Sequence, residues 1–257
     1  MSGGPESDGG GVNVLAVAGL PEVTEGMALG ELIAARAALE PGDVVVVSHK
    51  VVSKAEGRLR ALSSAIPGTE ARRLAAALGK DPALVELILA ESREVLRAEG
   101  GVLITETHHG FVCANAGVDS SNLPDPDTVC LLPEDPDASA RRIRAELRAA
   151  SGVAELATIV ADSFGRAWRL GQAEVAIGCA GIAPIDDWRG RTDSGGRELE
   201  ATMIAIADEA AAAADLIREK TSGVPVAIVR GLGRHLTDED GPGAAALRRP
   251  RDEDLFR

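Results

Sequence analysis

Short runs of β-branched and small apolar residues recur along the chain, and several follow one another too closely for a helix to fit between them. The runs are VNVLAVAG, DVVVVSH, GVLITET, FVCANAG, DTVCLLP, LATIVAD, EVAIGCAG and PVAIVRG. Each has the composition of a buried strand, which excludes a helical bundle. A parallel pair needs a long crossover, so strands this closely spaced fit a purely parallel βαβ sheet poorly. The sequence therefore predicts an α/β chain of mixed α+β type with mixed sheets.

Helix signals lie between some of these runs. Asp81 and Pro82 provide an N-cap and a first-turn proline before ALVELILAES. Asp137 is predicted to cap ASARRIRAELRAA, whose leucines and arginines recur at helical spacing. The alanine-rich stretch from about Glu198 to Lys220 predicts a long helix with an apolar face that needs a cover.

The chain is acidic, with 27 Lys and Arg against 40 Asp and Glu and a net charge of −13. This balance disfavours nucleic acid and anionic membranes as partners, so an anionic ligand needs a local basic pocket. The 3 cysteines lie far apart and predict neither a disulfide framework nor a zinc cluster. We recognise no secretion signal, membrane span or standard nucleotide-binding glycine motif, and we expect a cytoplasmic protein.

Basic side chains crowd the stretch SHKVVSKAEGR, directly after the valine-rich run. Two ammonium groups come from Lys50 and Lys54, and a planar guanidinium comes from Arg58; all can bind phosphate oxygens. Ser53 adds a hydroxyl group. A solvated basic turn is the alternative, and composition alone favours it.

Acidic and amide side chains follow two other predicted strands. The segment HHGFVCANAGVDSSN supplies Asp119 and Asn122, and IVADSFGRAWRLGQ supplies Asp162 and Ser163 at a strand end, followed by Arg166 and Arg169. Oxygen ligands of this kind suit a hard divalent cation, so the combination predicts a metal and phosphate site. Each aspartate taken singly is more often a turn former or a helix cap.

Two further segments allow more than one interpretation. His108 and His109 are adjacent, without a third His or Cys at ligand spacing, and we interpret them as structural contacts rather than zinc ligands. The segment IDDWRGRTDSGGRELEAT is either a mobile cover over a site or a solvated surface loop.

These motifs, in this order, resemble those of the coenzyme F420:L-glutamate ligases, also called F420-0:gamma-glutamyl ligases. The resemblance rests on GLPEV, DVVVVSHKVVSKAEGR, ESREVLR, HGFVCANAGVDSSN, ADSFGRAWRLGQAEVAIGCAG and ADEAAAAADL, between Gly19 and Gly231. It implies the family's own α/β fold and an intertwined homodimer. It also implies a GTP-dependent ligase that adds L-glutamate to the lactyl-phosphate tail of coenzyme F420-0 or its dehydro form. The first glutamate forms an amide bond and later ones are γ-linked, with release of GDP and phosphate.

The same resemblance implies the site residues and the cofactors. Leu20, Pro21, Glu22, Val23, His49, Lys54 and Asn122 fall at GTP-contacting positions, and Asp119, Asp162 and Ser163 at positions that bind Mg²⁺ or Mn²⁺. Lys54, Asp119 and Asp162 are the implied catalytic residues, and a potassium requirement is implied as well. Ser163 stands where the family has threonine, and serine keeps the hydroxyl oxygen.

The sequence also predicts how the chain is divided. We expect a disordered N-terminus over residues 1–11, the ligase domain over residues 12–235 and a linker-like tail over residues 236–257. The tail resembles the junction that, in actinobacterial members, leads into a flavin-binding domain. The alternative functions are a binding protein that senses a nucleotide without chemistry and a metal-dependent GTP hydrolase.

Overall fold

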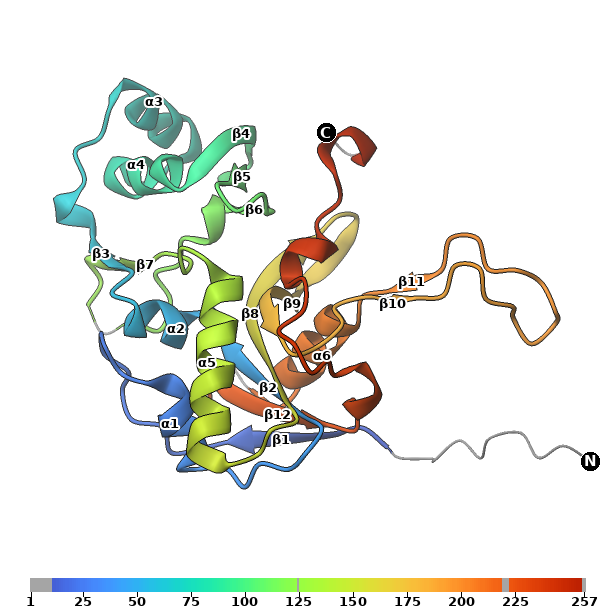
Figure 1. Cartoon of the computed structure of the whole chain (residues 1–257). Helices are drawn as coiled ribbons and strands as arrows, with labels where there is room; N and C mark the ends of the chain where they lie inside the picture. Colours follow the sequence, from blue (N-terminus) through green and yellow to red (C-terminus); the bar gives the residue numbers. More distant parts are fainter. Residues whose placement is uncertain (1–10, 124, 219–221, 256–257) are drawn as a thin grey trace, which may run out of the picture.

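The computed structural model describes residues 11–123, 125–218 and 222–255. A five-stranded sheet with the order β1-β12-β2-β8-β9 forms the body (Figure 1). Its strands are β1 (Asn13–Val17), β2 (Asp43–Ser48), β8 (Leu156–Arg166), β9 (Arg169–Ala180) and β12 (Val226–Arg230). β2 and β8 run parallel and the other neighbours antiparallel, so the predicted mixed sheet is confirmed.

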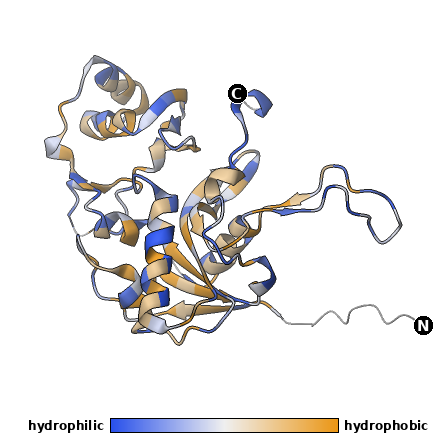
Figure 2. Cartoon of the chain, in the orientation of Figure 1, coloured by the Kyte–Doolittle hydropathy of each residue, from blue (hydrophilic) through white to orange (hydrophobic). Residues whose placement is uncertain are grey.

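Helices cover both faces of this sheet. α1 (Leu29–Ala34), α2 (His49–Ala55) and α5 (Pro136–Ser151) lie on one face, and α6 (Ile206–Asp215) lies on the other. Side chains alternate along a strand, so Val45 and Val47 pack on the α5 side whereas Val44 and Val46 pack on the α6 side. Figure 2 shows the hydrophobic strands of the body between their covering helices.

A smaller lobe follows α2 in the sequence and has its own core (Figure 1). It contains α3 (Thr69–Leu78), α4 (Pro82–Ala90), β4 (Ser92–Glu99), β5 (Val102–Thr107) and β6 (Val112–Ala114). The paired strands β3 (Leu59–Ala61) and β7 (Thr128–Cys130) connect it to the body. The predicted cap of α4 is confirmed, because Asp81 Oδ1 accepts a hydrogen bond from Ala83 N at 2.6 Å.

Short elements complete the fold. They are the strands β10 (Asp186–Asp187) and β11 (Met203–Ile204), and the 3₁₀ turns η1 (Leu62–Ser64), η2 (Asn115–Gly117), η3 (Gly233–His235), η4 (Ala244–Leu247) and η5 (Arg251–Glu253). Among the described helices, none combines the length and the apolar character that a membrane crossing requires.

The prediction of a helix from about Glu198 is wrong. Residues 186–204 form an antiparallel arm in which β10 pairs with β11, and farther out Gly190 N donates to Leu199 O at 3.0 Å. This cross-arm pairing satisfies the backbone groups that a helix would otherwise bond internally. The alanine-rich helix α6 begins only at Ile206, and its apolar face packs against the body of the same chain. Lys220 lies outside the described residues.

The predicted cap of α5 is also wrong, by two residues. Asp135 is the N-cap, with its Oδ1 accepting from Ala138 N at 2.9 Å. The carboxylate of Asp137 instead accepts hydrogen bonds from Cys179 N at 2.9 Å and from Ala244 N at 2.7 Å. Asp137 therefore ties β9 and the C-terminal segment to the start of α5.

The C-terminal segment lies against both parts of the molecule. Asp240 pairs with the buried Arg144 of the body at 2.8 Å, and Arg251 pairs with Glu94 of the smaller lobe at 2.6 Å. Of the predicted disordered N-terminus, residues 1–10 lie outside the described residues.

Candidate functional site

A cavity of about 750 Å³ lies at the C-terminal end of β2. The pairing of β2 with β8 ends at Ser48 and Ala161, and residues 162–165 of β8 continue along the cavity wall. The wall also contains residues 20–23, the start of α2, the segment that follows β6, and the end of the α6 region. Ligands of open α/β sheets bind outside the carboxyl ends of strands, which is where this cavity lies.

The predicted site residues come together in this one cavity, although they are far apart in the sequence. Its wall includes Leu20, Pro21, Glu22, Val23, His49, Lys54, Asp119, Asn122, Asp162 and Ser163. Lys50 also lines it, whereas Arg58, Arg166 and Arg169 lie elsewhere. The prediction that β8 ends at Asp162 is wrong, because the strand continues to Arg166 and forms a hairpin with β9.

Asp119 lies on the side of the cavity formed by the segment after β6. Lys50 Nζ approaches Asp119 Oδ2 at 2.7 Å, and Ser121 N donates to Asp119 Oδ1 at 2.7 Å. Burial raises the pKa of the Asp119 carboxyl, but the hydrogen bonds from Lys50 and Ser121 outweigh it and hold the pKa below its ordinary value. The resulting stabilisation is present above the unfolded pKa and is lost as the pH falls through the folded pKa.

Asp162 lies in the cavity wall next to a buried histidine. His49 is 2% exposed, and its Nε2 lies 3.2 Å from Asp162 Oδ1. The approach lacks hydrogen-bond geometry, and within the described part of the chain neither ring nitrogen of His49 has a hydrogen-bond partner. Asn115, also in the wall, has a buried side-chain oxygen without a partner among the described residues. Buried polar atoms left unbonded are costly, so these groups favour a ligand in the cavity.

Backbone conformation supports the same conclusion. Asn115, Ala116 and Asn122 all have positive φ, between 53° and 57°, although none is glycine. Non-glycine residues in the left-handed region cost free energy and cluster at ligand sites. All three lie on the segment that carries Asp119 into the cavity wall.

Lys54 lies on the last turn of α2, and its side chain is 11% exposed. Its Nζ is 2.6 Å from Oε1 of Glu22, whose side chain is 71% exposed. Such a partner can turn into solvent at little cost, since exposed ion pairs contribute little. Lys54 can therefore bind an incoming anion without the loss of a buried salt bridge.

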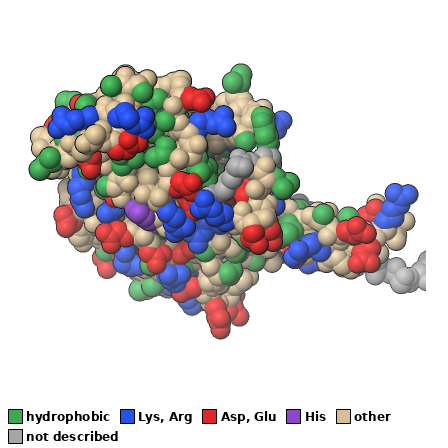
Figure 3. Space-filling view, turned by 90° about the horizontal axis from the view of Figure 1, so that it is seen from above, with side chains coloured by type: hydrophobic (Ala, Val, Ile, Leu, Met, Phe, Trp, Pro, Cys, Tyr) green, Lys and Arg blue, Asp and Glu red, His purple; other side chains and the backbone are tan. Residues whose placement is uncertain are grey.

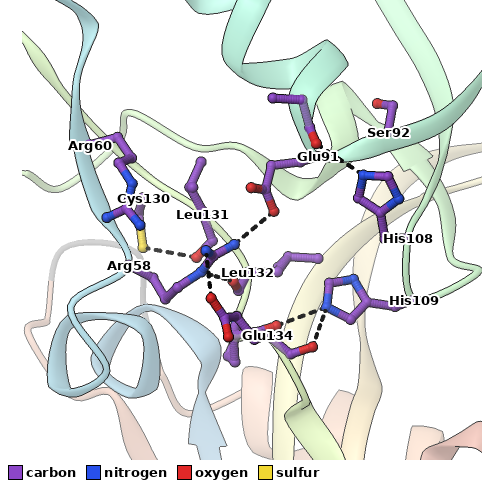
Figure 4. A network of polar contacts seen from close by, with 12 residues as sticks. Arg58, Arg60, Glu91, Ser92, His108, His109, Cys130, Leu131, Leu132 and Glu134 are labelled. Carbon is purple, nitrogen blue, oxygen red and sulfur yellow. Dashed lines mark hydrogen bonds and ion pairs between the residues drawn. The ribbon is translucent and has the colours of Figure 1, made fainter. Parts of the chain in front are cut away.

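Arg58 belongs to a different network, which joins the two parts of the molecule (Figure 4). Its Nη2 donates to Glu91 Oε2 of the smaller lobe at 2.7 Å, and its Nε donates to Leu132 O of the body at 2.9 Å. His108 and His109 take part as predicted, as structural contacts: His109 Nε2 lies 2.8 Å from the carbonyl oxygen of Pro133.

Carboxylates outnumber cationic side chains in the cavity wall. The carboxylates are Glu22, Asp119, Asp162, Glu174 and Asp215, and the cations are Lys50, Lys54 and Arg218. A polyphosphate would meet net repulsion in this cavity unless a metal ion entered with it. Within the described residues no cluster of three His, Cys, Asp or Glu side chains could hold a metal. Asp119, Asp162 and Ser163 line this cavity and carry carboxylate and hydroxyl oxygens, the ligand type that a hard cation prefers, and such a cation takes further oxygens from phosphate and water.

The part of the cavity wall on the α6 side of the sheet was not predicted from the sequence. Gln172, Glu174, Asp215 and Arg218 line the cavity there. Glu174 stands directly opposite Ser163 in the β8–β9 pairing. Extending the predicted strand at Asp162 into a hairpin would have revealed this neighbour, since cross-strand partners share a face.

The cysteine in the cavity wall gives a first prediction. Burial, followed by the nearby carboxylate of Asp162, raises the pKa of the Cys113 thiol to about 12. Because the thiolate is the nucleophile, we expect iodoacetamide at pH 8 to label Cys113 about 100-fold more slowly in the native than in the urea-unfolded protein. Mass spectrometry of labelled peptides measures both rates. Equal rates would show that the thiol is not protected in the folded chain.

Comparisons with known proteins show similarity over most of the chain. The family model described as F420-0:Gamma-glutamyl ligase matches residues 19–231. The chain is 44% identical over 253 residues to the coenzyme F420:L-glutamate ligase of Methanothermobacter thermautotrophicus, with 96% of this chain and 99% of the relative covered. It is 45% identical over 253 residues to the enzyme of the same name from Methanopyrus kandleri, with 96% and 100% covered. With a family match over most of its length and relatives of this similarity, the chain belongs to the F420-0:gamma-glutamyl ligase family.

Proposed function

We propose that the chain is a GTP-dependent ligase that joins L-glutamate to coenzyme F420-0 or its dehydro form and releases GDP and phosphate. The observation that carries the proposal is the convergence of Lys54, Asp119 and Asp162 from separate segments on one cavity, in a chain of this family. A first amide bond to the lactyl carboxylate, followed by γ-linked additions, is the proposed bond chemistry.

Amide formation requires an activated acceptor, because a carboxylate is a poor electrophile. In the proposed reaction GTP phosphorylates the acceptor carboxylate, and the glutamate amine then displaces the phosphate. Lys54 and the segment 20–23 would hold the nucleotide, together with His49 and Asn122. Phosphoryl transfer of this kind depends on positioning and on offsetting charge, which the ammonium of Lys54 supplies.

A divalent cation is part of the proposal. The cation, Mg²⁺ or Mn²⁺, would be held by Asp119, Asp162 and Ser163. When bound, it would neutralise negative charge on the phosphates. Lys50, paired with Asp119 at 2.7 Å, is placed to keep that carboxylate ionised and oriented. The potassium requirement stays a prediction.

Phosphate release tests the proposed function against its alternatives. The purified protein receives GTP and Mg²⁺, with L-glutamate and F420-0 added or omitted one at a time. A ligase releases phosphate only when both are present. Release without glutamate would identify a hydrolase, and GTP binding without release under any condition would identify a sensor.

Two exposed extensions support a proposed homodimer. The arm 186–204 stands out from the body and carries acidic and basic side chains (Figures 1 and 3). At the tip of the β8–β9 hairpin, Trp168 is 81% exposed and Leu170 is 98% exposed. None of the described arm residues lines the cavity of its own chain in this structure. The face of α6 is already buried in its own chain and does not contribute to this proposal.

We expect light scattering at micromolar concentration to give twice the chain mass of 26.4 kDa. Replacing residues 188–201 by a short glycine turn should shift the mass toward the monomer, because the arm then cannot pack on a partner. A monomeric mass for the unaltered chain would contradict the prediction.

A further inference from the structure

The α6 side of the cavity has a buried ion pair that the proposed nucleotide and metal roles do not use. Arg218 is 6% exposed and Glu174 is 7% exposed, and both line the cavity. Arg218 Nη2 contacts Glu174 Oε2, and Arg218 Nη1 donates to Pro225 O at 3.1 Å. In the part of the chain that the structure describes, Arg218 Nε has no acceptor.

The register of the β8–β9 hairpin places this pair beside the proposed metal residues. Ser163 is paired with Glu174, and Gly165 with Gln172. Directly opposite residues of an antiparallel pair project from the same face. Glu174 is therefore the cross-strand neighbour of the Ser163 hydroxyl, and Gln172 follows it along the same face.

The pair is costly as a purely structural device. Both ions are removed from water, and a buried ion pair is often no more stabilising than apolar side chains of similar volume. Burial lowers the pKa of the Arg218 guanidinium to about 10, so the group stays protonated at neutral pH but is not fully compensated. A second anion against its unpaired edge would offset that burial.

We propose that Arg218 and Glu174 form the subsite for the amino-acid substrate, with the guanidinium binding a carboxylate of L-glutamate and Glu174 binding its amino group. The proposal rests on the proposed ligase function. A planar guanidinium matches a carboxylate through two parallel hydrogen bonds, and a carboxylate matches an ammonium. Asp215, also in the wall, adds negative charge that favours the ammonium end.

This placement also gives the amine a proton acceptor. The ammonium must lose one proton before its nitrogen can attack the phosphorylated carboxylate of the acceptor. That first proton passes to Glu174, the new N–C bond forms, and the C–O bond to phosphate breaks with its electron pair leaving on the phosphate. The nitrogen then loses its second surplus proton to the departing phosphate, which leaves a neutral amide. Glu174 then returns the proton to the released phosphate or to water.

Steady-state kinetics with three variants test the subsite. Arg218→Lys keeps the charge but loses the fork, so the KM for L-glutamate should rise about tenfold or more while the KM for GTP stays within about twofold. Glu174→Gln keeps the shape but cannot accept the proton, so kcat should fall as well. Arg144→Lys is the control, since it alters a buried arginine paired with Asp240 outside the cavity wall. The control should leave both KM values unchanged.

A glutamate KM that is unchanged in both site variants overturns the subsite, and so does an equal rise in the KM values for GTP and glutamate. If Arg218→Lys fails to fold, the double variant Glu174→Arg with Arg218→Glu keeps an ion pair while reversing its direction. It should fold by circular dichroism and lose the glutamate dependence. Retained wild-type glutamate kinetics in this variant would also overturn the proposal.

Direct binding separates this proposal from the ligase function. Isotope-labelled L-glutamate is titrated into the protein with GTP and F420-0 omitted, and binding is followed by NMR. We expect binding to the wild type and loss of binding in Arg218→Lys. If the wild type shows no glutamate-dependent phosphate release, the ligase function fails. Even in that case, glutamate binding to the wild type that is lost in Arg218→Lys supports the amino-acid subsite. A wild type that does not bind glutamate, or an Arg218→Lys variant that does, overturns the subsite.

Discussion

Replacing either Asp119 or Asp162 with asparagine should reduce glutamate-dependent phosphate release about 100-fold or more. Asparagine keeps the shape of the side chain and one oxygen. It removes the negative charge that stabilises the cation bound together with phosphate in the cavity. Titration of Mn²⁺, followed by paramagnetic resonance, should show weaker metal binding in both variants. Nucleotide binding without metal should change much less.

The two effects should be strongly non-additive. If both carboxylates hold one cation, the first substitution already disables the site. The rate of phosphate release in the double variant should then be no more than about threefold below that of the less active single variant. Asp208→Asn is a matched control, because Asp208 is a half-buried carboxylate outside the cavity wall that accepts a hydrogen bond from Ala176 N. Additive losses, or full activity in either single variant, would contradict a shared site.

Replacing Lys54 with methionine should weaken GTP binding about 10- to 150-fold. The range corresponds to the roughly 1.5 to 3 kcal/mol that a hydrogen bond to a charged group contributes. Methionine keeps the length and the apolar stem of the side chain, and the partner lost in the free protein is the largely exposed Glu22. The fold should therefore be retained.

Isothermal titration calorimetry with GTP and Mg²⁺ measures this affinity. Lys80→Met provides the control, since Lys80 follows α3 in the smaller lobe and does not line the cavity. It should leave the affinity unchanged. If Lys54→Met binds GTP with unaltered affinity, the basic stretch after β2 is a solvated turn of helix without a role in phosphate binding.

Local patterns were sufficient to predict much of the fold. The valine run of β2 and the other apolar runs formed strands as predicted, because burial on both faces selects continuous β-branched residues. Asp81 with Pro82 predicted its helix start because both act within one turn. The error at Glu198 has a physical cause: alanine favours a helix locally, but residues 186–204 find backbone partners across an arm.

Some site residues could be predicted because they lie in one short motif directly after a strand, as Asp119 and Asn122 do. Its pairings were not predictable from local sequence. The contact of Lys50 with Asp119 depends on how the smaller lobe returns to the body, and the contact of Glu174 with Arg218 depends on the hairpin register and on α6. Patterns of spacing carry no information on such long-range contacts.

The most direct test of the proposed ligase function is the mass of the product formed from F420-0. F420-0 is incubated with the protein, GTP, Mg²⁺ and L-glutamate, and the products are separated and weighed by mass spectrometry. We expect F420-0 that is heavier by one or more glutamyl residues, formed only when GTP and glutamate are both present, with one phosphate released per residue added. GTP consumption with F420-0 of unchanged mass would contradict it.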